Sequence, residues 1–220
     1  MKTEYRGPSR VGEVRSGPVV VRLARPSEPD RLLDDPHVAT LNRRDDYMPY
    51  WAYLWPGSHL LAAVLSRGAW SGERALEIGC GLGLAGLVGV ARGLRVDFTD
   101  YDSAPLDYVA ESCRANGFDP GSYSVGAFDW REPQDRTYPV ILGADILYEA
   151  RLVPLVARLL GRMLATGGEA LIADPYRVAA SGFRGAVEEL GLVCRVEAVE
   201  AESVELGAIR GTLHRVSRPS

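Results

Sequence analysis

The chain has 220 residues, of which 46% are apolar, and its formal net charge is −4 at pH 7. A chain of this length can bury a full core as one globular domain, and a negative net charge disfavours a dedicated nucleic-acid binder. There is no apolar run of membrane-spanning length and no N-terminal signal segment, and the three cysteines (Cys80, Cys113 and Cys194) lack disulfide or zinc-binding spacing, so we expect a cytoplasmic protein with no metal site.

Residues 1–46 are predicted to form an N-terminal extension to a main domain that spans 47–220. The extension is rich in Pro, Gly and Arg over 1–36, but two apolar runs at 11–14 and 19–23 flank a Ser-Gly-Pro turn. Short apolar runs on both sides of a turn signal are typical of a β-hairpin. We therefore predict a hairpin within the extension.

An aromatic cluster opens the main domain. It reads Tyr47-Met-Pro-Tyr-Trp-Ala-Tyr-Leu-Trp-Pro-Gly-Ser58 and precedes a helix predicted over 58–66. Rings in such a cluster either pack as a layer over a sheet or form a lid that borders a ligand pocket. The sequence alone leaves both alternatives open.

Residues 74–86 combine a strand, a glycine-rich turn and the start of a helix. The apolar positions 75, 76 and 78 fit a short buried strand, and Gly79, Gly81 and Gly83 allow the backbone to turn tightly against a ligand. This order of elements is typical of a nucleotide-binding turn.

Helices and strands alternate after this turn. The predicted helices cover 82–92, 103–116, a segment that ends at 164, and 179–190, and the predicted strands cover 94–99, 122–126, 140–144, 169–173, 193–199 and 204–216. Alternation of this kind predicts an α/β fold with a Rossmann-like, doubly wound, seven-stranded and mostly parallel sheet, with helices on both faces. The last two strands have no helix between them, which predicts an antiparallel strand at one edge.

The nucleotide is not defined by the glycine turn itself. Gly81-x-Gly83-x-x-Gly86 fits the dinucleotide fingerprint, and Asp100 follows at the end of the next strand. However, Glu77 directly before the turn would oppose a pyrophosphate and would suit a cationic group. Lys2 is the only lysine, so no Tyr-x-x-x-Lys arrangement for hydride transfer is present, and an NAD oxidoreductase is the least favoured alternative.

The sequence resembles the seven-strand class of S-adenosylmethionine-dependent methyltransferases. Residues 76–83 resemble the first motif of that class, and residues 98–102 resemble its second-strand acidic segment. Within the class, the chain is similar to protein-lysine methyltransferases that carry an Asp-x-x-Tyr motif, including those acting on the electron-transfer flavoprotein β subunit and on valosin-containing protein. The matching segments are Trp55-Pro-Gly-Ser58, Phe128-Asp-Trp130, Asp145-Ile-Leu-Tyr148 and Asp174-Pro-Tyr-Arg177.

The resemblance implies S-adenosyl-L-methionine as the cofactor. A carboxylate at the tip of the second strand can accept both ribose hydroxyls, so Asp100 is the strongest candidate, whereas Asp102 fits better as the cap of the following helix. Asp129 is expected to accept from the adenine amine while Trp130 packs on its face. The predicted cofactor-binding residues are Trp55, Glu77, Gly79, Gly81, Gly83, Asp100, Tyr101, Asp129, Trp130 and Ala144.

Asp145 and Tyr148 are the predicted catalytic residues. They follow the strand beside the point where the strand order reverses, which is where open α/β sheets bind ligands. Methyl transfer needs an uncharged amine held in line and a site that tolerates the cationic product, so Asp145 would orient the amine and Tyr148, with Tyr176, would wall the channel. The alternative for Asp145 is a helix cap near Glu149.

We therefore expect an N-methyltransferase that acts on a lysine side chain of a protein. A small-molecule N-methyltransferase with the same cofactor site and a non-catalytic cofactor-binding partner protein are the alternatives. We expect no nucleic-acid or membrane partner and a monomeric state. The sequence does not identify the acceptor or the number of methyl groups transferred.

Overall fold

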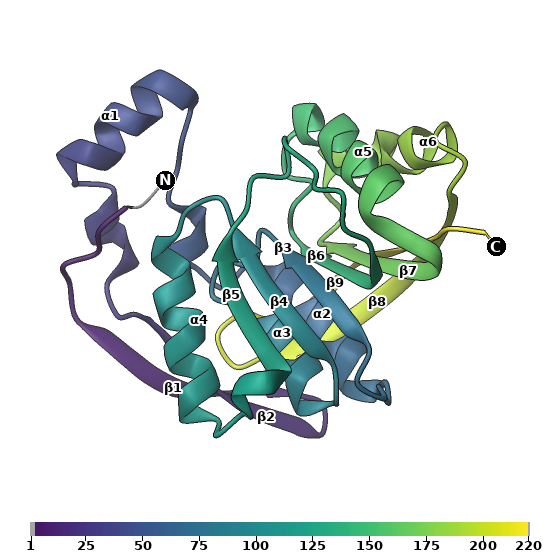
Figure 1. Cartoon of the computed structure of the whole chain (residues 1–220). Helices are drawn as coiled ribbons and strands as arrows, with labels where there is room; N and C mark the ends of the chain where they lie inside the picture. The colour runs from purple at the N-terminus through teal and green to yellow at the C-terminus, as the bar shows by residue number, and fades with distance from the viewer. Residues whose placement is uncertain (1–2, 220) are drawn as a thin grey trace.

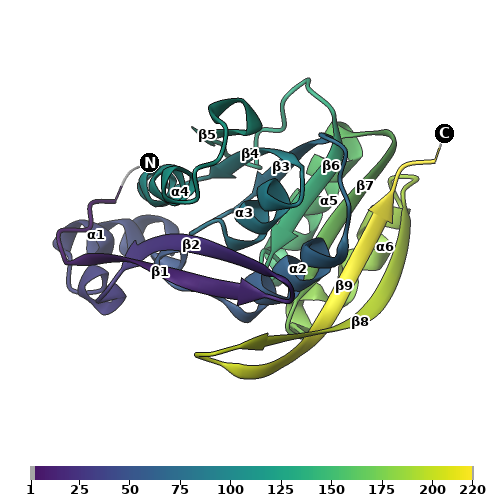
Figure 2. The same cartoon turned by 90° about the horizontal axis from the view of Figure 1, so that it is seen from below.

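The computed structural model describes residues 3–219, and within this range the chain forms a seven-stranded sheet with helices on both faces and a separate two-stranded hairpin (Figures 1 and 2). Residues 1–2 of the predicted extension and residue 220 lie outside the described residues. The strand order in the large sheet is β5-β4-β3-β6-β7-β9-β8. The strands are β3 (Arg74–Ile78), β4 (Arg95–Asp100), β5 (Tyr123–Ala127), β6 (Tyr138–Ala144), β7 (Leu164–Asp174), β8 (Val193–Ser203) and β9 (Gly207–Ser217).

The topology confirms the predicted fold class. Strands β3 to β7 pair in parallel, and β9 pairs antiparallel with both of its neighbours. The antiparallel strand thus lies between β7 and the edge strand β8. The order reverses between β3, which leads outward through β4 to β5, and β6, which starts the other half of the sheet. Ligands bind at such reversal points in open α/β sheets.

Two hydrophobic cores lie on opposite faces of the sheet. One contains apolar residues of α2 (Pro56–Arg67), α3 (Leu84–Ala91) and α4 (Ala104–Ala115), and the other contains those of α5 (Val153–Met163) and α6 (Phe183–Glu188). Residues of β3 alternate between the cores, with Ala75 in the first and Leu76 and Ile78 in the second. Because neighbouring strand residues point to opposite faces, Glu77 shares the face of Ala75 and points towards α3.

The predicted hairpin consists of β1 (Ser9–Ser16) and β2 (Val19–Pro26), which pair antiparallel. Val21 and Leu23 of β2 are buried in the first core. The side chain of Asn116, at the end of α4, accepts from the Arg22 N–H at 2.8 Å and donates to the Arg22 carbonyl at 2.6 Å. These hydrogen bonds fix the outer edge of β2 against α4, so the hairpin and the main sheet share one core.

Some element bounds differ from those predicted. The short helix α1 (Pro36–Asp45) was not predicted, although the Asp35 side chain caps it by accepting the His37 N–H at 2.7 Å, and Pro36 at its first turn is a recognised start signal. The predicted helix 179–190 is a 3₁₀ segment, Val178–Gly182, followed by the short α6. None of the helices in residues 3–219 has the length and apolar character to cross a membrane.

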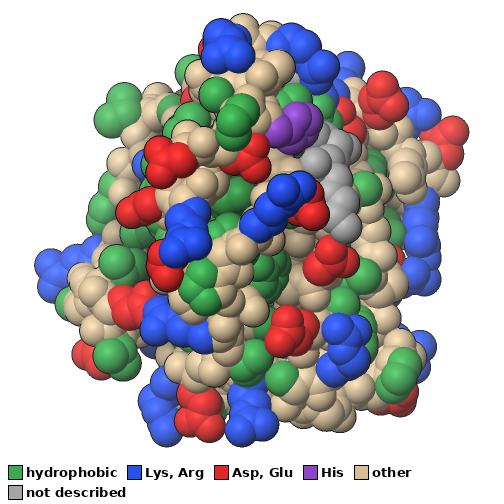
Figure 3. Space-filling model, turned by 90° about the vertical axis from the view of Figure 1, so that its left-hand side faces the viewer, with side chains coloured by type: hydrophobic (Ala, Val, Ile, Leu, Met, Phe, Trp, Pro, Cys, Tyr) green, Lys and Arg blue, Asp and Glu red, His purple; other side chains and the backbone are tan. Residues whose placement is uncertain are grey.

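Charged side chains are mixed on the face seen from the left of Figure 1. Arg side chains lie among Asp and Glu side chains there and do not gather in one block (Figure 3). The elements at this side of the molecule are α1 and β1, with α4 next to them.

Candidate functional site

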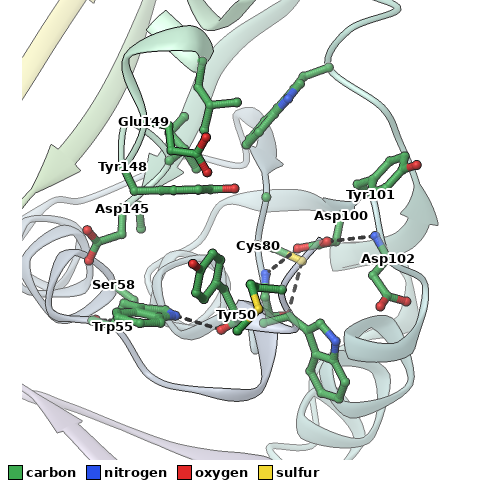
Figure 4. Close-up of a pocket in the computed structure, with 18 of the residues that line it drawn as sticks. Tyr50, Trp55, Ser58, Cys80, Asp100, Tyr101, Asp102, Asp145, Tyr148 and Glu149 are labelled. Carbon is green, nitrogen blue, oxygen red and sulfur yellow. Dashed lines mark hydrogen bonds between the residues drawn. The ribbon is translucent and has the colours of Figure 1, made fainter. Parts of the chain in front are cut away.

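A cavity of about 530 Å³ lies at the carboxyl ends of the central strands (Figure 4). Its volume is within the range of small-molecule and cofactor sites. All of the predicted site residues except Glu77 line it, namely Trp55, Gly79, Gly81, Gly83, Asp100, Tyr101, Asp129, Trp130, Ala144, Asp145 and Tyr148. The structure thus brings together residues that are far apart in the sequence.

The glycine turn is held in a backbone conformation that other residues rarely adopt. Gly79, Gly81 and Gly83 have φ values of 58°, 51° and 74°. A Cβ added at Gly79 would lie 3.0 Å from the Trp130 ring, which is closer than side-chain carbons normally approach. The absence of a side chain at Gly79 therefore lets Trp130 close one wall of the cavity against the turn.

Asp100 lies at the tip of β4, below the turn. Its two carboxylate oxygens accept the N–H groups of Gly81 at 2.9 Å and of Asp102 at 3.0 Å. Each carboxylate oxygen can accept a second hydrogen bond, so two acceptor positions remain for hydroxyl groups of a ligand. Burial raises the pKa of Asp100 to about 6, and the carboxylate is therefore ionised at neutral pH.

Glu77 differs from the prediction, which placed its carboxylate in the crevice. Its side chain is 2% exposed and lies beneath α3, where Oε1 accepts the Gly86 N–H at 3.3 Å. Oε2 is buried with no hydrogen-bond partner among the described residues, and burial raises the pKa of Glu77 to about 8. The pleat of β3 turns Glu77 away from the cavity, so it supports the turn from below instead of lining it.

The end of the cavity at the glycine turn also contains Trp130, Asp129, Arg131 and Tyr101. Arg131 donates from Nε to Asp129 Oδ1 at 2.8 Å, and its guanidinium lies 4.7 Å from the centre of the Tyr101 ring. Burial alone would raise the pKa of Asp129, but the hydrogen bonds from Arg131 hold it below its ordinary value. Asp129 is therefore already ion-paired, and its predicted contact with an adenine amine remains a prediction.

Asp145 lies at the end of β6 with a φ of 57°, which is uncommon for a residue with a side chain. Its Oδ2 accepts the Gly57 N–H at 2.6 Å and its Oδ1 accepts Arg177 Nε at 2.9 Å. Burial raises the pKa of Asp145, although both donors oppose this shift. Asp145 is not the cap of the next helical segment, because that segment starts at Ala150 and has Glu149 at its N-cap.

Aromatic rings form the wall opposite the glycine turn. The Tyr50 ring packs edge to face against Trp55 at 5.6 Å and against Tyr148 at 5.5 Å, and Trp55 Nε1 donates to the Tyr50 carbonyl at 2.7 Å. In Figure 4 the Tyr148 ring extends across the cavity, whereas the Asp145 carboxylate points away towards Trp55 and Ser58. Tyr176, expected to be a further wall, does not line the cavity and is exposed.

The aromatic cluster at 47–55 serves both of the roles that the sequence left open. Trp51 is buried and packs on Tyr108 with ring centres 5.8 Å apart, and it also lines the cavity together with Tyr50 and Trp55. Asp102 fixes this segment, because it accepts from the Tyr47 hydroxyl at 2.5 Å while capping α4 through the Ala104 N–H at 2.9 Å. The aromatic cluster is thus attached to the main domain directly beside Asp100.

Tyr50, Arg131 and Arg177 line the cavity but were not predicted to be site residues. Tyr50 lies in the aromatic cluster, and Arg177 lies in the motif-bearing segment 174–177. The pairing of Arg131 with Asp129 follows a short-range pattern, since the two residues are two positions apart. The pairing of Arg177 with Asp145 joins different strand ends and has no local signal.

A model of a family described as lysine methyltransferase matches residues 52–182. The chain is 29% identical over 109 residues to EEF1A lysine methyltransferase 3 of Mus musculus, and this alignment covers 48% of this chain and 47% of the relative. It is 30% identical over 118 residues to Protein N-lysine methyltransferase METTL21A of Danio rerio, and this alignment covers 50% of this chain and 53% of the relative. The chain therefore spans about half the length of the curated relatives that it matches.

Solved structures share the fold at low sequence identity. One is the complex between the Haloferax volcanii Trm112 methyltransferase activator and the putative methyltransferase, with a TM-score of 0.60, 15% identity and coverage of 88% of this chain and 98% of that chain. Another is a putative methyltransferase from Thermoplasma acidophilum, with a TM-score of 0.56, 15% identity and coverage of 70% and 71%. At these identities the likeness establishes the fold alone.

Proposed function

Because this chain belongs to the lysine methyltransferase family, we propose that it transfers a methyl group from S-adenosyl-L-methionine to a lysine side chain of a protein. The observation that carries the proposal is the continuity of the cavity. One cavity joins Asp100 and the glycine turn at one end to the aromatic walls of Tyr50, Trp55 and Tyr148 at the other.

The residues at the first end fit the cofactor. Asp100 retains two acceptor positions of the kind that a ribose diol requires, and Trp130 presents an aromatic wall beside Gly79 for a flat base. The turn leads into α3 with Gly83 at its N-cap, so backbone N–H groups face this end of the cavity. When bound, the cofactor would supply an electrophilic methyl group on a sulfonium.

The residues at the second end fit an amine. The rings of Tyr50, Trp55 and Tyr148 offer π faces and edges that can surround a cationic or neutral amine and exclude water. The transfer needs the uncharged form of the amine, since a lysine ammonium has no lone pair. Burial raises the pKa of the Tyr148 phenol to about 12, so its hydroxyl stays protonated, and its oxygen can accept an N–H of the amine while the amine lone pair stays free for the methyl group.

The names of the relatives support a protein acceptor. METTL21A and EEF1A lysine methyltransferase 3 are named for protein lysine methylation. A histidine protein methyltransferase 1 homolog of Dictyostelium discoideum is 26% identical to this chain over 144 residues, so the methylated residue type is an outcome that the experiment must resolve.

The test is methyl transfer from radiolabelled S-adenosylmethionine to a lysate, followed by acid hydrolysis and amino-acid analysis. We expect label in macromolecules, recovered as methyl-lysine. At a cofactor concentration below saturation, Asp100→Asn should reduce the transfer by about 10-fold to 100-fold, and Asp34→Asn, which changes an exposed aspartate outside this cavity, should leave it unchanged. Recovery of the label in methyl-histidine or in small molecules would show that the acceptor is not a protein lysine. Tight S-adenosylhomocysteine binding without any transfer would favour a non-catalytic partner protein.

A further inference from the structure

The amine end of the cavity already contains a cation, the guanidinium of Arg177. Arg177 Nε donates to Asp145 Oδ1 at 2.9 Å, and Arg177 Cζ lies 5.8 Å from the centre of the Trp55 ring. A carboxylate and an aromatic face are the two groups that an incoming ammonium would use here. Arg177 thus holds the contacts that the acceptor would otherwise make.

The donors to the two Asp145 oxygens differ in how easily they can be displaced. Oδ2 accepts the N–H of Gly57 in the first turn of α2, and a backbone N–H in a helix cannot be moved aside by a ligand. Oδ1 is bound by a side chain that is 32% exposed and can change rotamer. A cation that is to lie between Asp145 Oδ1 and the Trp55 ring must therefore replace the Arg177 guanidinium.

The turn that carries Arg177 is held firmly at its base. The Arg177 N–H donates to Asp174 Oδ1 at 2.6 Å, and Asp174 Oδ2 lies 3.2 Å from His214 Nε2 on β9. Asp174 and His214 are both buried. Tyr176 within the turn has a φ of 58°, a conformation that a bulky side chain adopts only when its surroundings impose it. The backbone of Arg177 is thus fixed, and displacement of its guanidinium requires only a change of side-chain rotamer.

The residues on either side of Arg177 are exposed and apolar. Tyr176 is 58% exposed and Val178 is 89% exposed. A protein that docks over this loop while it brings an amine into the cavity would bury both side chains, which would offset the lost Arg177–Asp145 pair. A small free amine has no such surface, and it competes against a tethered cation whose effective concentration is roughly millimolar or higher.

We propose that Arg177 is a specificity-determining residue, which occupies the cation position between Asp145 and Trp55 and excludes small free amines in favour of amines carried by a docking protein. This inference rests on the proposed function, because it assigns the amine to this end of the cavity. Arg177 acts as an internal competitor, and the acceptor protein displaces it through the surface around Tyr176 and Val178.

The test uses a small cation and does not depend on enzymatic activity. The probe is n-butylamine, which is an ammonium ion at neutral pH, and n-butanol serves as an uncharged probe of similar shape. Binding is followed by NMR through the indole N–H signals of the four tryptophans, with S-adenosylhomocysteine present. Trp55 reports on the cation position, and Trp70, which does not line the cavity, is the internal reference.

Arg177→Gln should bind n-butylamine about fivefold to tenfold more tightly than the wild type, as expected for removal of a partly exposed competing ion pair. It should show no such gain for n-butanol. Arg177→Lys restores a tethered cation and should behave as the wild type does. Arg184→Gln, which removes an exposed arginine paired with Glu188 on α6, is the matched control and should also match the wild type.

Equal or weaker n-butylamine binding by Arg177→Gln would overturn the proposal and would show that Arg177 only supports Asp145. An unchanged Trp70 signal establishes that the variant is folded. As a second measurement, Arg177→Gln should raise methyl transfer to Nα-acetyl-lysine relative to lysate proteins, and an equal loss on both acceptors would contradict the proposal. If the wild type transfers no methyl group, the proposed function fails while the NMR comparison still decides the role of Arg177.

Discussion

Glu77 provides a test of whether its carboxylate supports the glycine turn or contacts the cofactor. The perturbation is Glu77→Gln, which keeps the shape of the side chain and its acceptor for the Gly86 N–H. The carboxylate is buried, Oε2 has no hydrogen-bond partner among the described residues, and burial raises its pKa from 4.5 to about 8. The substitution therefore removes a titrating group from the core without removing the hydrogen bond.

The size of the effect follows from proton linkage. Between pH 4.5 and about 8 the folded protein binds more protons at Glu77 than the unfolded chain does, so Glu77 lowers stability as the pH rises through this window. At about 1.4 kcal/mol per pH unit, the penalty grows from about 0.7 kcal/mol near pH 5 to about 3 kcal/mol near pH 7. The glutamine amide leaves a buried N–H unpaired at about 1–3 kcal/mol, but this cost does not change with pH.

The assay is urea unfolding of wild type and Glu77→Gln near pH 5 and near pH 7. We expect the stability difference to shift in favour of the variant by about 2–3 kcal/mol between the two conditions. Glu13→Gln, on the exposed side of the hairpin, should show no such shift. S-adenosylhomocysteine affinity should stay within about threefold of the wild type, which is less than the loss of one charged hydrogen bond would produce. A pH-independent difference, or a much larger loss of affinity, would refute the buried supporting role.

Three further outcomes are expected. Asp100→Asn should weaken S-adenosylhomocysteine binding by about 10-fold to 100-fold in calorimetry, and wild-type affinity should fall as the pH drops through about 6, where Asp100 takes up a proton. Gly57→Ala places a Cβ 2.7 Å from Asp145 Oδ2 and should lower both activity and melting temperature, whereas Gly12→Ala, with nothing within 4 Å, should be neutral in both. Asn116→Ala should reduce stability by about 1–2 kcal/mol in urea unfolding through loss of its hydrogen bonds to β2, without changing cofactor affinity.

Local sequence signals predicted the fold well where neighbouring residues determine it. The β3–turn–α3 unit depends on an apolar run and on glycines whose positive φ values only they adopt readily, and both can be read from residues 74–86. The helix predicted over 179–190 was too long at its start, because Val178–Gly182 is a 3₁₀ segment and Gly182 is the N-cap of α6, so that only Phe183–Glu188 is α-helical. β7 starts at Leu164, earlier than predicted, because Gly167 with a φ of 72° allows the strand to bend where a turn was expected.

The residues that line the cavity were largely predictable from the sequence, but the directions of their side chains were less so. Motif positions at strand ends converge at one edge of a parallel sheet, so Asp100, Trp130 and Tyr148 reach one cavity without further information. Side-chain direction depends on the pleat and on tertiary partners. Glu77 was therefore placed at the correct strand end but on the wrong face, since an acid beneath a helix has no distinguishing pattern in the sequence.

The partners of Asp145 alter how its mutation should be interpreted. Its carboxylate joins the first turn of α2 through Gly57 to the loop after β7 through Arg177, and the N-cap of α2 is Trp55, which forms part of the aromatic wall. Removing the carboxylate would free Arg177 and release the start of α2 together. Loss of methyl transfer in Asp145→Ala would thus follow even if Asp145 never touched the amine. Arg177→Gln is the more informative variant, because it keeps the Gly57 contact and the start of α2 and leaves Asp145 Oδ1 open, so that a gain in its affinity for a small cation reports a direct role of Asp145.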